Sequence, residues 1–336
     1  MNISRRSFLK LSCLAALTVT LTGKQGCKLA AGPPDSPDLP DSPKIDTLEK
    51  EIDTHLEKNK KLNKTFELYK GVLAVHLAYI DKIDVPLALT KTEIMDLFKR
   101  NQYVLSQHQL KFDPPVFKEI LHSIIGVMEE KNTETSESLA NLLDTQEFEK
   151  NNIQEFLNKT TPYDKVEMER YIQKIGMDKR TGVDKELISF VTFTSASPFY
   201  KKCREVVTGI TDFSLWQQGF CPVCGQTSTI AKHRHEDGAR IMDCWLCHAQ
   251  WYHPRMECPY CDNNDQKKLR FFYIGGDNTR QIHICQVCNR YLKVIDGRAM
   301  ESETILEVED IATEYLDVLA QKEGYNPPAQ NRSVLY

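Results

Sequence analysis

Four Cys-x-x-Cys pairs within residues 221–288 constrain this chain more than any other feature of its sequence. Eight of its eleven cysteines belong to these pairs, which are Cys221/Cys224, Cys244/Cys247, Cys258/Cys261 and Cys285/Cys288. A pair on a tight turn presents two sulfurs at the spacing that one tetrahedral metal ion accepts, and a second pair completes a four-sulfur shell. The spacing therefore predicts two metal sites in which these eight cysteines are the ligands.

Taken in order, the pairs form two modules with the spacings C-x2-C-x19-C-x2-C and C-x2-C-x23-C-x2-C, separated by ten residues. Each intervening segment suits a short β-hairpin that brings its two cysteine turns together. Two turns read Cys-Pro-Val-Cys-Gly and Cys-Pro-Tyr-Cys-Asp, in which proline fixes φ and Gly225 permits a positive φ. Zinc ribbons and rubredoxin iron sites share this geometry, so the residues leave iron and zinc open.

Other uses of these side chains fit less well. A disulfide framework would need four bridges that each close a very small, strained loop. A catalytic dithiol normally occurs singly on a βαβ scaffold. His233 and His235 lie in the polar segment between the first two pairs and are interpreted as solvated, because eight cysteines already complete both shells. Cys203 stands outside every pair and is expected to fill a small apolar site.

The whole chain predicts an α+β protein. Residues 45–212 have helical apolar spacing and predict an all-α bundle. Residues 213–255 and 256–300 predict a first and a second rubredoxin-like or zinc-ribbon β module, and 301–336 an acidic C-terminal helix and tail. Trp216 is expected to pack the first module onto the bundle. Because the apolar stripes of the bundle do not involve the cysteines, we expect it to stay folded without metal.

The expected elements follow from periodicity and punctuation. Helices are predicted over 45–63, 65–83, 92–107 with Thr92 as N-cap, 116–130, 136–158, 164–175, 186–207 and 301–323, and strands over 239–243, 249–252, 270–274, 281–284 and 290–295. The bundle contains no Gly-rich phosphate loop, no nucleophile elbow and no His–carboxylate pair at metal spacing. We therefore expect a protein that is not an enzyme.

The first residues predict an export address followed by a linker. Residues 4–10 read Ser-Arg-Arg-Ser-Phe-Leu-Lys, which matches the twin-arginine pattern, and a mildly apolar stretch follows. We interpret residues 1–31 as a twin-arginine signal segment and 32–44, with five prolines, as an extended linker. The expected partner is the twin-arginine export machinery. The expected location is the periplasm, or the outer face of the membrane if the segment is kept as a tether.

The charge of the cysteine region argues against nucleic acid. Residues 213–300 contain eleven basic and eight acidic side chains, within a chain of net charge −4. A divalent ion held by four thiolates leaves each site at about −2, so the loaded region has a net charge of about −1. Because phosphate-binding surfaces normally have a clear positive excess, we expect no nucleic-acid partner.

Several motifs together resemble a known family. Residues 216–225 read Trp-Gln-Gln-Gly-Phe-Cys-Pro-Val-Cys-Gly, Trp251 follows the second pair, and the fourth pair continues as Asn-Arg-Tyr-Leu-Lys. The chain ends with Glu-Asp-Ile-Ala over 309–312 and Ala-Gln-Lys-Glu-Gly-Tyr over 320–325. These motifs look like those of the FdhE-type formate dehydrogenase accessory proteins. The resemblance is specific over 213–325 and concerns architecture alone over 45–212.

This resemblance implies two rubredoxin-like metal sites on a helical domain, with iron preferred to zinc and the eight cysteines as ligands. It also implies a chaperone-like factor that a molybdenum- or tungsten-dependent formate dehydrogenase requires for its activity and that binds the catalytic subunit of that enzyme. The family is cytoplasmic, whereas this chain carries an export address. The alternative function is a rubredoxin-like electron-transfer protein with two four-cysteine iron sites, and a zinc-ribbon nucleic-acid binder ranks third.

Overall fold

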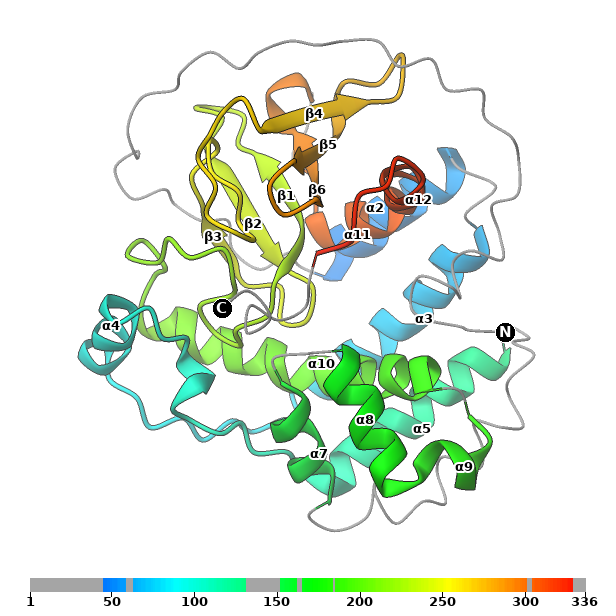
Figure 1. Cartoon of the computed structure of the whole chain (residues 1–336). Coiled ribbons are helices and arrows are strands. Elements are labelled where there is room, and N and C mark those ends of the chain that lie inside the picture. The colour runs from blue at the N-terminus through cyan, green and yellow to red at the C-terminus, as the bar shows by residue number, and fades with distance from the viewer. Residues whose placement is uncertain are drawn as a thin grey trace.

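The computed structural model describes residues 45–58, 63–130, 152–161, 165–183, 185–300 and 304–328. The expected signal segment and linker lie outside these ranges. Helices precede and follow one six-stranded sheet, with the longer group of helices packed below the sheet in Figure 1. The predicted α+β class is confirmed.

The helices before the sheet follow the predicted apolar spacing. They are α2 (Ile45–Lys58), α3 (Asn63–Ile80), α4 (Lys91–Lys99), the 3-10 helix η2 (Val104–Ser106), α5 (Pro114–Glu130), α7 (Asn152–Thr160), α8 (Lys165–Ile175), α9 (Met177–Thr181) and α10 (Lys185–Ile210). The 26-residue helix α10 packs against α3, α5 and α8. Residues 136–151 of the expected helix 136–158 lie outside the described ranges.

Two predicted boundaries in this part are wrong. The helix expected over 92–107 begins after Thr90. The Thr90 hydroxyl oxygen accepts a hydrogen bond from the Glu93 N–H, and the Thr90 N–H donates one to the Glu93 carboxylate. This reciprocal capping box makes Thr90 the N-cap, two residues before the predicted Thr92. The helix also stops at Lys99, because the backbone reverses at Asn101 with a φ of 56°.

The sheet has six strands, and each half of the cysteine region supplies three of them. In chain order they are β1 (Ser228–His233), β2 (Arg240–Cys244), β3 (Gln250–Tyr252), β4 (Leu269–Tyr273), β5 (Arg280–Cys285) and β6 (Arg290–Asp296). Their spatial order is β3-β2-β1-β6-β5-β4. All neighbours are antiparallel except β1 and β6, which pair in parallel with Ile230 opposite Lys293. The two expected β modules therefore join into one sheet, through a strand β1 that sequence reasoning missed.

This strand order places β3 and β4 at opposite edges of the sheet, although they follow each other in the chain. With strands about 4.8 Å apart, the connection must cross on the order of 24 Å. Residues 253–268 make this crossing, and we call them the crossover segment. Arg240 of β2 donates from Nη1 to the Glu257 carbonyl at 3.0 Å and from Nη2 to the Arg255 carbonyl. The crossover segment therefore runs over the face of the sheet that carries Arg240.

The opposite face is covered by the C-terminal helices α11 (Leu306–Ala312) and α12 (Glu314–Lys322). The prediction of one helix over 301–323 is wrong, because the backbone leaves helical geometry at Thr313 with φ −104° and ψ 20°. The buried Lys293 of β6 pairs with Asp310 at 2.7 Å and Asp317 at 2.8 Å, one carboxylate on each helix. This pairing fixes both helices against the centre of the sheet.

A single apolar core runs from the helices into the cysteine region. It contains helical residues such as Ile124 and Phe199 together with Cys221, Cys244 and Trp251. Trp216 joins the two parts as predicted, with its ring 5.1 Å from that of Phe98 in α4 and 5.1 Å from that of Phe220. The helices and the cysteine region therefore bury side chains in one core, and the expectation that the helices stay folded without metal remains a prediction.

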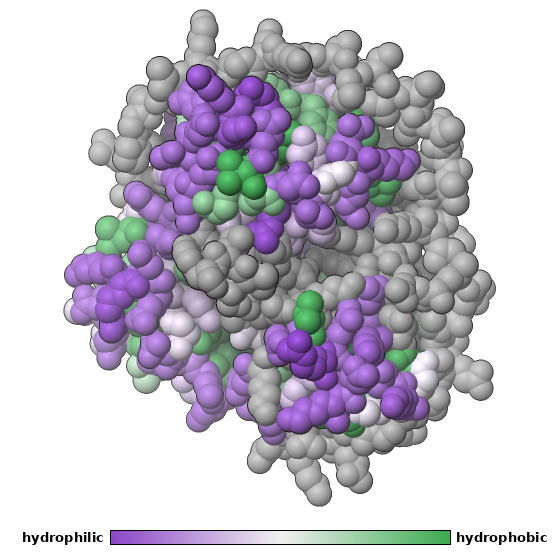
Figure 2. All heavy atoms as spheres, in the orientation of Figure 1, coloured by the Kyte–Doolittle hydropathy of each residue, from purple (hydrophilic) through white to green (hydrophobic). Residues whose placement is uncertain are grey.

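The outer surface is polar over much of its area. Figure 2 shows mostly hydrophilic side chains on one face, with the apolar ones in small separate patches. Within the described ranges, no helix combines the length and the apolar composition needed to cross a membrane.

The backbone of the crossover segment comes very close to Gly219, so a substitution there tests this contact. A Cβ atom on Gly219 would lie 1.8 Å from the Pro259 carbonyl oxygen, so no larger residue fits without moving the crossover segment. We expect Gly219→Ala to lower the free energy of unfolding by about 1–3 kcal/mol in a denaturant titration. Gly126→Ala is the control, because a Cβ there meets nothing within 4 Å inside α5 and should be neutral or stabilising. Equal effects of the two substitutions would contradict the close approach.

Candidate metal centres

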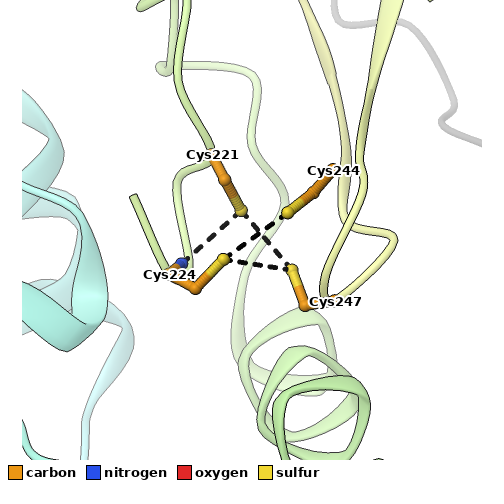
Figure 3. A group of neighbouring side chains, drawn as sticks. All are labelled: Cys221, Cys224, Cys244 and Cys247. Atoms are coloured by element: carbon orange, nitrogen blue, oxygen red, sulfur yellow. Dashed lines mark hydrogen bonds between the residues drawn. The ribbon is translucent and has the colours of Figure 1, made fainter. Parts of the chain in front are cut away.

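The structure brings the eight predicted cysteines together as two groups of four. The first centre contains Cys221, Cys224, Cys244 and Cys247, and the second contains Cys258, Cys261, Cys285 and Cys288, with the sulfurs of each group within 4.8 Å of one another. Figure 3 shows the four side chains of the first centre pointing from two turns towards one point. The pairing of the turns is the one that the sequence predicts, and their role as ligands stays a prediction.

The sulfur geometry fits a tetrahedral ion. In the first centre the Cys221–Cys247 and Cys224–Cys244 sulfurs are 3.5 Å apart, and in the second the Cys258–Cys288 and Cys261–Cys285 sulfurs are 3.7 Å apart. A regular tetrahedron with metal–sulfur bonds of about 2.3 Å has sulfurs about 3.8 Å apart. All eight cysteines are free thiols, which excludes disulfides between them in this structure. The donor set suits zinc and iron equally.

All four cysteine turns share one backbone conformation. The fourth residue after the first cysteine of each turn has a positive φ, at Gly225 (75°), His248 (53°), Asp262 (55°) and Asn289 (55°). Its N–H donates to the carbonyl of that first cysteine at 3.0, 2.9 and 3.0 Å in the first three turns. Gly225 signals this in the sequence, whereas Asp262 and Asn289 merely tolerate it and His248 gives a weak signal.

Backbone N–H groups also point at the sulfurs. The N–H of Val223 lies 3.4 Å from the Cys221 sulfur, and the N–H of Tyr260 lies 3.4 Å from the Cys258 sulfur. Burial raises the pKa of the Cys221 and Cys224 thiols, so an ion that enters the first centre must displace their protons. The N–H donors then face thiolates, which accept hydrogen bonds better than thiols do.

Helices enclose the first centre. The N–H groups of Val104 and Leu105 in η2 donate at 2.9 Å to the carbonyls of Pro222 and Val223, between the first two ligands. Ser197 of α10 donates from its hydroxyl to the Leu246 carbonyl at 2.9 Å, between the other two. All four cysteines of this centre are fully buried. Both turns of the first centre are therefore fixed by the helical part of the chain.

A buried group of charges that sequence reasoning missed lies beside the first centre. His248 Nδ1 is 3.0 Å from Asp243 Oδ2, and its Nε2 is 3.2 Å from Glu307 Oε1, which also accepts from Lys201 Nζ at 2.7 Å. Burial alone would lower the pKa of His248, but the carboxylates of Glu307 and Asp243 raise it to about 9. Although burial opposes it, His248 and Lys201 hold the pKa of Glu307 well below its usual range. Two cations and two anions therefore balance, and they connect α10, the second cysteine turn and α11.

The second centre is nearer to the surface. Cys258 and Cys285 are buried, whereas Cys261 and Cys288 are only half-buried. Val287, between two of the ligands, is 58% exposed, which makes it a rare large apolar side chain on the surface of the described residues. The Asn263 amide lies 3.8 Å from the Cys285 sulfur. The two centres therefore differ in their access to solvent and to partners.

Of the two histidines predicted to be solvated, His233 and His235, the first is buried and the second is exposed. His233 is not solvated: it is 2% exposed, and its ring lies 5.4 Å from that of His283. The tip of the hairpin between β1 and β2 is shorter than expected, because β1 continues to His233 and the side chain of His233 is buried. His235 is exposed, as expected, and donates from Nδ1 towards the Gly297 carbonyl at 3.1 Å. Neither histidine belongs to a cysteine group.

Comparison with known proteins supports the resemblance. The chain is 23% identical over 273 residues to an FdhE homologue of Aquifex aeolicus, across 80% of this chain and 88% of that protein. It is 32% identical over 124 residues to an FdhE homologue of Stutzerimonas stutzeri, across 34% of this chain and 38% of that protein. The crystal structure of the FdhE protein from Pseudomonas aeruginosa has the same fold, with a TM-score of 0.55 and 13% identity, over 83% of this chain and 92% of that one. No protein-family model matches the chain.

We expect two metal ions per chain. Elemental analysis with X-ray absorption on the purified protein should show two ions with four sulfur neighbours each, at about 2.3 Å. Cys203→Ala is the control, because Cys203 is buried in α10 and belongs to neither group, so it should leave the metal content at two. One ion per chain, or nitrogen neighbours, would contradict the ligand sets.

Proposed function

We propose that this chain, which is of the FdhE type, is a non-enzymatic factor for the maturation of a formate dehydrogenase. In this proposal it binds the catalytic subunit of a molybdenum- or tungsten-dependent enzyme, and the bound enzyme needs this contact to become active. The two metal ions, iron in preference to zinc, stabilise the surface that makes the contact.

The enclosure of the first centre carries this proposal. Four cysteines fill a tetrahedral shell, so the ion has no open position for a substrate, as in structural sites. Its turns are hydrogen-bonded to η2 and α10 and belong to the main core. Because the ligands come from separate turns, the free energy of metal binding becomes free energy of folding. An ion in this position supports a rigid scaffold better than it supports chemistry.

A second candidate function rests on the second centre. An electron carrier needs a sulfur edge near solvent, and Cys261 and Cys288 are half-buried beside the exposed Val287. An iron ion there could pass one electron to a partner that docks on this turn. This reading requires a redox-active metal, whereas the maturation reading requires only a folded protein.

Exchange of the metal separates the two functions. The full chain would be loaded with zinc, which has no redox chemistry, and checked for two ions and a native unfolding midpoint. We expect the zinc-loaded chain to bind the formate dehydrogenase catalytic subunit. We also expect it to restore formate oxidation in cells that lack this chain in its iron-loaded form. Binding without restored activity would contradict the scaffold and favour electron transfer.

The second centre offers a matched variant for the same assay. Cys261→Ser with Cys288→Ser removes the two half-buried cysteines of the second centre, so it should disturb the main core less than loss of the first centre. We expect weaker capture of the catalytic subunit, because the turn that carries Val287 loses its metal tie. Cys203→Ala serves again as the control, with unchanged capture. Full capture by the double variant would show that the catalytic subunit does not contact the turn that carries Val287.

We propose further that the chain is exported by the twin-arginine machinery and works in the periplasm or tethered to the outer face of the membrane. The seven-residue match over 4–10 motivates this location. Because that route carries folded proteins, both metal centres would be loaded before export.

Conservative substitutions test the address. Arg5→Lys with Arg6→Lys should keep the protein in the cytoplasm, measured by cell fractionation, while the metal content stays at two. Arg100→Lys makes the same charge-conserving exchange at an exposed position after α4 and should not alter the location. A wild-type chain that is already cytoplasmic would overturn this proposal and leave the maturation role intact.

A further inference from the structure

A cavity of about 390 Å³ lies between the sheet and the crossover segment. Side chains of β4, β5 and β6 and Arg240 of β2 form one wall, and residues 255–260 of the crossover segment form the other. The second centre borders it, because Cys258 and Cys285 are among the lining residues. Cavities of this size, from about 300 Å³ upward, hold small-molecule ligands in other proteins.

The lining of this cavity is strongly basic. It contains the arginines 240, 255, 270 and 290, whereas Glu257 is the one carboxylate among the lining residues. A loaded second centre would add about −2 along one wall, which leaves the lining positive.

In the described part of the chain, three of these arginines, Arg240, Arg270 and Arg290, lack the carboxylate partners that other arginines of the sheet have. Elsewhere on the sheet Arg280 pairs with Glu309 at 2.6 Å, and Arg298 pairs with Asp296 at 2.6 Å. Within the described ranges, Arg240, Arg270 and Arg290 form no ion pair with a carboxylate. Positive charge is therefore left uncompensated where the chain could have placed acidic residues.

Arg240 shows the cost of this arrangement most clearly. It is 3% exposed, and two of its nitrogens donate to the carbonyls of Glu257 and Arg255. Its Nε atom is buried without any hydrogen-bond acceptor. Burial of a guanidinium that pairs with no carboxylate is unfavourable. Burial accordingly lowers the pKa of Arg240 to about 10. An anion in the cavity would offset this cost.

The rest of the lining is apolar. Leu269 and Phe271 of β4, Leu292 of β6 and Met256 of the crossover segment contribute hydrocarbon, aromatic and thioether surface. A free inorganic ion would leave this surface without a partner. The cavity therefore combines oxyanion recognition by arginine with space for an apolar body.

We propose that this cavity binds a small organic anion in which a phosphate or carboxylate group is joined to a flat apolar body. The charged group would lie near Arg240 and Arg290, with Arg270 of the edge strand β4 at the rim, and the apolar body would lie along Phe271. Nothing in this assignment depends on the maturation role or on the identity of the metal.

A competing explanation is that the arginines serve only to offset the negative charge of the second centre. Arg270 and Arg290 distinguish the two accounts, because both are at least partly exposed and can be changed without emptying the core. If they serve the metal, their loss should lower metal retention. If they serve a ligand, their loss should lower anion binding and leave the metal in place.

The test is calorimetric titration of the full, metal-loaded chain with four probes. 1-Naphthyl phosphate and 2-naphthoate carry the two acid groups on a flat apolar body, inorganic phosphate lacks the body, and 1-naphthol lacks the charge. We expect one site per chain for a naphthyl anion, weaker binding of inorganic phosphate and none of naphthol. The stronger of the two naphthyl anions identifies phosphate or carboxylate as the recognised group.

Two double variants with the same change in charge locate the site. Arg270→Gln with Arg290→Gln should weaken binding of the naphthyl anion by on the order of tenfold or more, since each removes a charge-assisted contact. Lys267→Gln with Lys268→Gln changes exposed residues outside the lining and should alter affinity by less than about twofold. Both variants should retain two ions per chain.

Several results would overturn the proposal. Equal losses in the two double variants would mean general surface electrostatics, and equal binding of naphthol would mean apolar adsorption. Loss of metal in the arginine variant without any anion binding by the wild type would assign the arginines to the second centre. Absence of binding of either naphthyl anion by the wild type would rule out a small organic anion as the occupant of the cavity.

Discussion

The parallel pairing of β1 with β6 determines how the rest of the cysteine region is built. Each half of that region runs in the same order, from a cysteine turn through two strands to a second turn and a third strand. Because β1 and β6 are parallel, the two halves lie in the sheet with the same orientation and the third strand of one half beside the first strand of the other. The chain must then return across the whole sheet to begin its second half. The crossover segment, the turn of the second centre that it carries and the cavity beneath it are all consequences of this one pairing.

The two faces of the sheet are stabilised by different means. On one face Lys293 is buried, 1% exposed, between Asp310 and Asp317, which compensates its charge and attaches both C-terminal helices. On the other face Arg240 is buried among backbone carbonyls, and no carboxylate of the described residues pairs with it. A buried cation with two carboxylate partners is compensated within the fold, whereas one without a carboxylate partner can be compensated by a loaded second centre, by water or by a ligand. The contrast between Lys293 and Arg240 separates a face that holds the fold from a face that is able to bind.

The sequence predicts the local parts of this structure and misses the parts that depend on distance. The grouping of the cysteines could be predicted, because Cys221 and Cys224 occupy one turn and a hairpin of 19 residues returns the chain to Cys244. The charge group at His248 could not be predicted, since Lys201 and Glu307 lie 106 residues apart and meet only after the C-terminal helices dock. The order of the strands could not be predicted either, because spacing within each half says nothing about which of its strands meets the other half. The predicted helix ends were wrong where a single hydrogen-bonded cap, such as Thr90 with Glu93, sets the boundary.

The difference between the two centres has a physical meaning that their identical ligands conceal. The first is enclosed by η2 and α10 and by a balanced group of four buried charges, so any change there is transmitted to the helical core. The second is attached mainly to the crossover segment and to the edge of the sheet, beside solvent and beside the basic cavity. A partner or ligand that moved the crossover segment would therefore reach the second centre and leave the first undisturbed. Of two sites with the same chemistry, one is positioned to hold the molecule together and the other to sense what binds it.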